Sequence, residues 1–567
     1  MFLPTTAKEL KKRGWREPDV ILVTGDAYID SPHVGVALIG RVLAGAGYRV
    51  GVIAQPDITT DTDIKRLGEP RLFWGITGGC MDSMVANYTA VGKKRNQDDL
   101  TPGGKNNRRP DRACLAYANL IRRYYKNTRP LVLGGLEAAM RRIAHYDYWS
   151  DSVRRSILFD ARADILAYGM AERAVLEIAQ RLKAGGDLKN IRGTCTIGDT
   201  VPEGYIELPS YEEAASDKKA FVRMFKIFSA NNDPVTASGL YQRHANRFLV
   251  HHPPAPHLTP DELDAVYGHP FTRRVHPFYA SGGKVRAMET ISFSLTTHRG
   301  CLGECNFCSI GLHEGRAIIS RSEESVLAEA CLITSHPDFR GYLTDVGGAT
   351  ANMYGIDCRR KYTKGGCSDR RCLFPQVCPS LKTDHSRHLK LLGRLREIPG
   401  VKKVFVASGM RHDLILADRK NGVRYLREVL LHHTSGQMKI APEHASGRVL
   451  ALMGKPSEEC LINFKKLFDD LNKAGGKKQF LTYYFIAAHP GCTMDDMQRL
   501  KTFAARRLNT TPRQVQIFTP LPSTWSALMY HTGLDQASGR RIFVEKNTRE
   551  KQKQKNTVTA EKNRRFG

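Results

Sequence analysis

Apolar runs alternate with helical patterns through residues 18–185. The helical patterns cover much of 32–46 and a stretch near 112–125. The apolar runs, which read as strands, are 19–26, 48–55, 71–79, 130–135 and 163–169. Strands that alternate with helices are typical of a parallel sheet with helices on its faces. The pattern predicts an α/β fold whose first part, residues 1–185, is a Rossmann-like, doubly wound N-terminal domain.

A second series of the same kind starts near residue 286. In the run 289–297, Ile291, Phe293 and Leu295 alternate with polar residues, which indicates a half-buried strand. Helical returns such as 457–473, with one apolar stripe, separate the later runs. Those runs are 341–346, 402–408, 437–442, 480–488 and 513–519. Six strands with helical returns predict a second α/β domain, over residues 286–533.

The intervening stretch, residues 186–285, has weaker periodicity and is dense in Pro, His and Tyr. Its histidines surround prolines at spacings that fit no metal-ligand pattern. The pattern predicts a structured connector between the two domains.

Thirteen cysteines occur in the 567 residues, and seven of them fall in two groups. No run approaches the roughly 18 apolar residues of a membrane span, and the start has no apolar core of a signal peptide. We therefore expect a cytoplasmic protein with no membrane partner. Grouped cysteines in such a chain indicate metal binding or catalysis rather than disulfides.

The first group, Cys301, Cys305 and Cys308, has C-x3-C-x2-C spacing directly after the strand 289–297. Iron–sulfur clusters are usually held by four thiolates. Three thiolates on one loop could hold three irons of a cubane and leave the fourth iron open for a ligand. The alternative is a zinc knuckle or a redox-inert cluster, although zinc prefers four closed ligands.

The second group, Cys358, Cys367, Cys372 and Cys378, lies in a loop rich in Lys, Arg, Gly and Pro after the second strand. A long loop without periodic structure needs something to order it. Four thiolates suit a structural zinc or a second iron–sulfur cluster. The alternative is four free cysteines in a mobile loop.

Several motifs resemble the YgiQ family of radical S-adenosylmethionine (SAM) proteins, from the first domain to about Gly533. They are DAYIDSP, THRGCLGECNFCSI with SRSEES downstream, GGATANMYG and IFTPLPSTWSALMYHTG. The resemblance implies a partial (β/α)6 radical SAM barrel with a Cys-rich insertion at 353–388. It also implies a [4Fe-4S] cluster whose open iron chelates SAM, reductive cleavage to a 5′-deoxyadenosyl radical, and a low-potential donor such as flavodoxin or ferredoxin. The family's substrate and catalytic residues are unknown.

The same resemblance suggests SAM-binding residues at the strand ends, where barrels of this kind carry their chemistry. Gly347 and Gly348 resemble the family's Gly-Gly-Glu motif, with Ala349 in place of the acid. Ser408 and Arg411 suit the methionine carboxylate or the ribose. Glu443 offers a further polar group after the fourth strand.

The N-terminal domain also resembles the partner domain of cobalamin-dependent radical SAM enzymes. The cobalamin motif is Asp-x-His-x-x-Gly, whereas the run from Asp30 through His33 reaches its glycine, Gly35, one position early. We therefore do not predict cobalamin.

The net charge of +29 makes RNA a reasonable partner, although part of the excess is local. Residues 546–567 carry eight Lys or Arg, and 534–567 are expected to form a basic, disordered tail. Two alternatives therefore stand beside a radical SAM enzyme of unknown substrate. One is a methylthiotransferase-like enzyme that modifies RNA, and the other is a non-catalytic iron–sulfur or zinc protein that binds nucleic acid.

Overall fold

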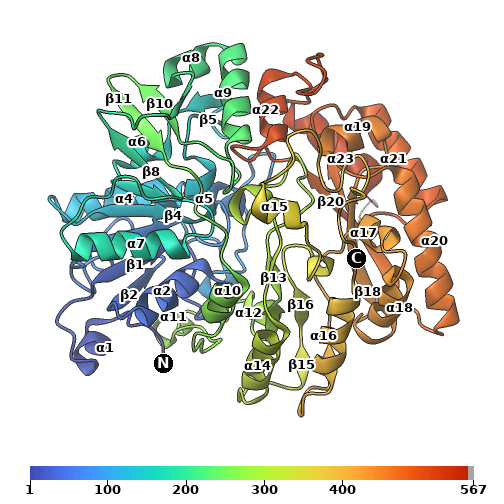
Figure 1. Ribbon diagram of the computed structural model, residues 1–567, viewed down its shortest axis with the longest axis horizontal. Helices are drawn as coiled ribbons and strands as arrows, with labels where there is room; N and C mark the ends of the chain where they lie inside the picture. The colour runs from blue at the N-terminus through green and yellow to red at the C-terminus, as the bar shows by residue number, and fades with distance from the viewer. Residues whose placement is uncertain (560–567) are drawn as a thin grey trace, which may run out of the picture. The chain divides into compact units, whose positions relative to one another are not determined.

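The computed structural model describes residues 1–559. The chain divides after Ser292 into two compact units. Each unit is built around its own parallel strands, and the α/β fold class predicted from the sequence is confirmed (Figure 1).

A nine-stranded sheet forms the centre of the first unit. Its spatial order is β2 (Val50–Ala54), β1 (Val20–Thr24), β3 (Phe73–Thr77), β4 (Leu131–Gly134), β7 (Ile165–Ala167), β8 (Thr194–Gly198), β11 (Arg247–His251), β10 (Leu240–His244) and β9 (Ile206–Leu208). The first five strands pair in parallel. They match the five predicted runs, because fully buried parallel strands read as continuous apolar segments.

The helices of the first unit include the two predicted ones, α2 (Gly35–Gly45) and α4 (Ala113–Tyr124). The remaining helices are α1 (Ala7–Lys12), α3 (Ser83–Asn87), α5 (Gly135–Met140), α6 (Ile157–Ala161), α7 (Glu172–Lys183), α8 (Tyr211–Ser216), α9 (Lys218–Ala230), α10 (Pro260–Tyr267), α11 (Pro277–Ala280) and α12 (Met288–Ile291). A short hairpin of β5 (His145–Asp147) and β6 (Ser152–Arg154) stands apart from the main sheet.

The segment 186–285 differs from the predicted connector. Strands β8, β11, β10 and β9 come from it and extend the sheet of the first unit. Strand β8 pairs antiparallel to both β7 and β11. Histidines such as His244 and His251 lie buried in these strands, so the polar-looking stretch conceals core positions.

Parallel strand pairs in chain order make up the second unit. They are β12 (Ser294–Thr296) with β16 (Asp345–Gly347), β15 (Tyr342–Leu343) with β17 (Lys403–Val404), and β18 (Gln437–Glu443) with β19 (Phe480–Ala487) and β20 (Gln514–Ile517). A parallel bridge between Met410 and Ile440 connects the third segment to the fourth. This succession has the strand order of a partial (β/α)6 barrel.

Helices cover the outside of these strands, and α14, α16, α18 and α20 contact one another in that order (Figure 1). The helices of this unit are α13 (Ile310–His313), α14 (Glu323–Thr334), α15 (Arg359–Thr363), α16 (Ser386–Arg396), α17 (His412–Ala417), α18 (Gly422–His432), α19 (Gly447–Met453), α20 (Glu458–Ala474), α21 (Met494–Arg506), α22 (Trp525–Thr532) and α23 (Thr548–Val558). Their apolar faces and the strands share one core, which includes Leu295, Val346 and Phe464.

Two predictions for this unit need correction. The first strand begins only at Ser294, because Met288–Ile291 forms helix α12. The basic end of the chain is ordered at least as far as α23, which packs against α21. Gln554 on α23 is buried and accepts a hydrogen bond from the backbone N–H of Ala488 at 2.9 Å. Residues 560–567 of the predicted tail lie outside the described part.

Within residues 1–559, none of the helices combines the length and the apolar character needed to cross a membrane.

Candidate functional site

The first cysteine group lies on a loop between two short antiparallel strands, β13 (His298–Arg299) and β14 (Ile319–Ser320). Gly300 opens this loop with φ +88°, and a Cβ atom there would lie 1.9 Å from the carbonyl oxygen of Ala317. Only glycine fits such a position. The chain therefore turns sharply out of the first barrel strand and presents the cysteines at the strand's carboxyl end.

The thiols of Cys301 and Cys305 gather around a glycine. A Cβ atom on Gly303 would lie 3.3 Å from Cys301 Sγ, 3.5 Å from Cys305 Sγ and 3.3 Å from Arg411 Nη1. The backbone N–H of Gly303 points to Cys301 Sγ at 3.4 Å, and Thr350 Oγ1 lies 3.5 Å from the same sulfur. Two of the three predicted ligands therefore face one side of the loop.

Arg411 places a buried positive charge beside these thiols. Its Nη1 donates to Cys305 Sγ at 3.6 Å, and its Nε donates to Asp413 Oδ1 at 2.8 Å. The buried amide of Asn352 fixes the backbone of Arg411, accepting from its N–H at 2.8 Å and donating to its carbonyl at 3.0 Å. Asn352 follows the second strand and Arg411 the third, so two strand ends hold this guanidinium in place.

Burial has the largest effect on the pKa values of Cys301 and Cys308. It raises the pKa of Cys301, and it raises the pKa of Cys308 to about 12. Nearby Cys305 adds to both shifts, while Thr350 and Arg411 oppose the shift at Cys301. These thiols are therefore protonated at neutral pH and release protons only when a metal group binds them.

Glu443 faces the same region from the end of β18. Its backbone is left-handed, with φ +69°, a conformation that costs energy in a residue with a side chain. Burial raises the pKa of its carboxyl group, and Lys455 and Arg411 act in the opposite direction. Lys455 Nζ lies 3.7 Å from Glu443 Oε1. The charge of Glu443 also contributes, as the smallest cause, to the raised pKa of Cys308.

The two glycines after the second strand pack tightly. A Cβ atom on Gly348 would lie 2.7 Å from the carbonyl oxygen of His298, and one on Gly347 would lie 2.9 Å from the Cα of Ala351. Ser408, predicted to face SAM, is hydrogen-bonded within the protein. Its hydroxyl donates to Asp345, whose carboxylate also accepts from the backbone N–H of Ser408 at 3.1 Å.

The second cysteine group flanks helix α15 and packs beside the first. Cys358, Cys372 and Cys378 contact one apolar cluster that contains Leu302, and half-buried Cys301 packs against the same cluster. The backbone N–H of Cys378 donates to the carbonyl of Cys372 at 2.8 Å. The structure thus brings three of the four thiols to one small core next to the first loop.

Within residues 1–559, no three His, Cys, Asp or Glu side chains converge closely enough to hold a single metal ion. This holds for both cysteine groups. A cubane differs from a single ion because each of its thiolates binds a separate iron.

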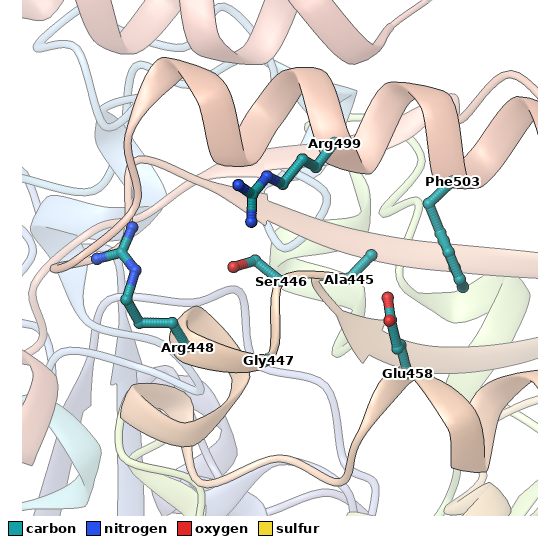
Figure 2. Close-up of a pocket in the computed structure, with 7 residues that line it drawn as sticks. All are labelled: Ala445, Ser446, Gly447, Arg448, Glu458, Arg499 and Phe503. Carbon is teal, nitrogen blue, oxygen red and sulfur yellow. The ribbon is translucent and has the colours of Figure 1, made fainter.

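A pocket of about 430 Å³ is lined by none of the residues predicted to bind the cluster or SAM. Its lining is Ala445, Ser446, Gly447, Arg448, Glu458, Arg499 and Phe503. Figure 2 shows Arg448 and Arg499 extending toward each other from α19 and α21. Asp496 already neutralises Arg448, with an Nη2–Oδ2 distance of 2.5 Å.

At the strand ends of the first unit, several charged groups pair with other groups of the protein. Asp26 pairs with buried Arg109 at 2.6 Å, and a Cβ atom on Gly79 would lie 2.3 Å from the Asp26 carboxylate. Glu137 accepts from the backbone N–H groups of Ser83 and Cys114, each at 2.9 Å. This edge of the sheet is closely packed with its own side chains.

Sequence reasoning missed four residues that shape the site: Thr350, Asn352, Asp413 and Lys455. Thr350 and Asn352 belong to the GGATAN run, so their position one turn after the glycines was an available signal. Asp413 and Lys455 carried no comparable signal, because neither belongs to a motif.

Comparison with known proteins identifies the family. The family model described as Radical SAM N-terminal matches residues 2–294. A UPF0313 protein of Fusobacterium nucleatum is 51% identical over 565 residues and covers 100% of both chains. A UPF0313 protein of Thermotoga petrophila is 49% identical and covers 99% of both chains.

A solved structure with a similar fold is the radical S-adenosylmethionine methyltransferase TsrM from Kitasatospora setae, with cobalamin and a [4Fe-4S] cluster bound. Its TM-score is 0.51 at 14% identity, over 93% of this chain and 79% of that chain. At this identity the likeness concerns the fold alone. The full-length relatives and the matching family model together show that the chain belongs to the UPF0313 family and is a radical SAM enzyme.

Proposed function

We propose that Cys301, Cys305 and Cys308 hold a [4Fe-4S] cluster at which the enzyme cleaves SAM reductively. The observation that carries this is the geometry of the loop at the end of the first barrel strand. There, Gly303 leaves room between two thiols, and the Arg411 guanidinium lies 3.6 Å from Cys305 Sγ.

The residues fit such a cluster chemically. Three thiols make an incomplete set for a structural zinc, which takes four closed ligands. They leave one iron of a cubane without a protein ligand. Buried Arg411 supplies a positive charge where the thiolates and the cluster would add negative charge, and buried negative charge requires such a partner.

When bound, the reduced cluster would supply the electron that splits a C–S bond of SAM into methionine and a 5′-deoxyadenosyl radical. The protein would position SAM and the substrate and exclude water from the reaction. The Asn352 amide holds the Arg411 backbone, and Asp413 fixes its guanidinium. Tight packing at Gly348 keeps the second strand end close to His298.

Strand ends next to the loop would bind SAM. Gly347 and Gly348 would offer backbone groups to SAM. Glu443 would offer a buried carboxylate to the methionine amino group, which the methyl group of Ala349 cannot do. Arg411 would serve the methionine carboxylate as well as the thiolates. Ser408 is bound to Asp345, so we assign it to holding the third strand against the second.

We do not propose a role for cobalamin. The run around His33 lacks the motif's glycine spacing, and side chains such as Asp26 and Arg109 fill the sheet edge. A low-potential protein such as flavodoxin or ferredoxin would supply the electron. Thirteen free cysteines suit the reducing cytoplasm, where thiols stay unoxidised.

The test is SAM cleavage by anaerobically reconstituted protein. Iron- and sulfide-loaded enzyme, reduced with dithionite, should convert SAM to 5′-deoxyadenosine and methionine, measured by liquid chromatography. Cys305→Ala should abolish this, whereas Cys331→Ala, at an exposed cysteine on α14, should not. Absence of 5′-deoxyadenosine from protein with a full cluster would refute the proposed function.

A further inference from the structure

Buried Lys361 connects the two cysteine groups. Its ammonium lies 3.2 Å from Glu304 Oε1, in the first cysteine loop, and donates to the carbonyl of Arg316 at 2.6 Å. The same ammonium is hydrogen-bonded to the thiol of Cys372. A single side chain on α15 thus touches both groups.

Arg371 makes a second connection. Its Nη1 donates to the carbonyl of Glu304 at 3.2 Å, and Cys372 is the next residue in the chain. Glu304 itself has a left-handed backbone, φ +46°, between Gly303 and Cys305. The strained residue of the first loop is therefore held from two sides by the cysteine-rich insertion.

Positive charge surrounds the second group. Residues 353–388 contain eight Lys or Arg and three Asp. Arg370 and Arg371 lie in the chain between Cys367 and Cys372. These basic residues would offset the negative charge that metal-bound thiolates bring to the insertion.

We propose that Cys358, Cys367, Cys372 and Cys378 hold a second iron–sulfur cluster, docked on the first cysteine loop through Lys361 and Arg371. Three of these cysteines adjoin one apolar core, and the fourth, Cys367, precedes Cys372 by five residues in the same insertion. Four thiolates complete a cubane without an open iron. Four thiolates also suit a structural zinc, so the metal count of the reconstituted protein decides between the two.

This second cluster is independent of SAM cleavage, so its test does not rely on the proposed function. In the variant Cys301→Ser/Cys305→Ser/Cys308→Ser, the first site cannot form. Protein reconstituted with iron and sulfide should retain about four irons and four sulfides per chain. The dithionite-reduced sample should show the electron paramagnetic resonance signal of a reduced cluster. Retention of zinc instead of iron, or of neither metal, would overturn the assignment.

The matched control removes the second site alone. Cys358→Ser/Cys372→Ser should lower the iron of the full chain from about eight to about four atoms. Cys331→Ser, at an exposed position, should leave it unchanged. Should a multiple variant fail to fold, the unmodified chain still decides, because two clusters require about eight irons with equal sulfide and no zinc. A count of about four irons with one zinc would refute the second cluster.

Discussion

Replacing Arg411 by Met removes a buried cation while keeping an apolar side chain of comparable length. Asp413 would then be left buried and unpaired, since only 5% of it is exposed. Removing one partner of a buried ion pair costs about 3–5 kcal/mol. For a domain of this size we expect the midpoint of thermal unfolding to fall by roughly 6–20 °C.

The pH dependence of this loss has a definite sign. Burial raises the pKa of Asp413, but the Arg411 guanidinium overrides it and lowers the pKa to about 2. In the wild type this carboxylate contributes about 2–3 kcal/mol of stability above pH 4, which is lost as the pH falls toward 2. Without Arg411, burial still raises the pKa of Asp413, and only the smaller effects of His412 and Lys455 oppose it, so we expect the pKa to rise above its ordinary value. The folded variant then binds a proton more readily than the unfolded chain, so its stability increases as the pH falls.

Scanning calorimetry of the metal-free, reduced protein between pH 5 and 8 measures both effects. The gap between wild type and Arg411→Met should be largest at pH 8 and should narrow toward pH 5. Arg411→Met/Asp413→Leu should recover most of the loss, because apolar replacement of a buried pair is close to neutral. A gap below about 1 kcal/mol, or one that widens toward pH 5, would refute the role given to this ion pair.

Gly348→Ala places a methyl group 2.7 Å from a backbone oxygen and should cost about 1–3 kcal/mol in thermal unfolding. Gly409→Ala meets no atom within 4 Å, so an equal loss there would contradict this packing argument. Lys361→Met removes the ammonium group beside Glu304 and Cys372, so the iron that the reconstituted protein retains after gel filtration should fall. An unchanged iron content would count against the connection between the two cysteine loops. Gln554→Ala leaves a buried backbone N–H without its acceptor and should cost about 1–3 kcal/mol, whereas an unaltered melting temperature would contradict the docking of α23.

Much of the fold could be read from the sequence where the signal is local. The run 437–442 predicted β18 to within one residue, and 480–488 predicted β19 equally closely. Strands β8 to β11 were missed because their core positions include histidines, which a periodicity argument counts as polar. Tertiary packing, with buried His251 stacked on Tyr168, decides those positions.

The candidate site divides in the same way. Cysteine spacing is a property of one short loop, so candidate ligands could be named from it directly. Asp413, by contrast, acts through Arg411, and the arginine reaches a thiol more than 100 residues away in the chain. Such a relation depends on three strand ends meeting in space, and no pattern along the sequence encodes it. Ser408 shows a different limit of sequence reasoning. A polar residue at a strand end can bind a residue of the neighbouring strand, as Ser408 binds Asp345, and the sequence does not reveal this.

The most direct test of the central claim is whether SAM binds an iron of the cluster held by Cys301, Cys305 and Cys308. Reduced enzyme can be mixed with SAM labelled with ¹⁵N in the amino group or ¹⁷O in the carboxylate and examined by electron–nuclear double resonance. We predict couplings from both labels to the reduced cluster, retained in Cys358→Ser/Cys372→Ser. A reduced cluster that shows no coupling to either label while SAM is bound would contradict the open iron on which the account rests.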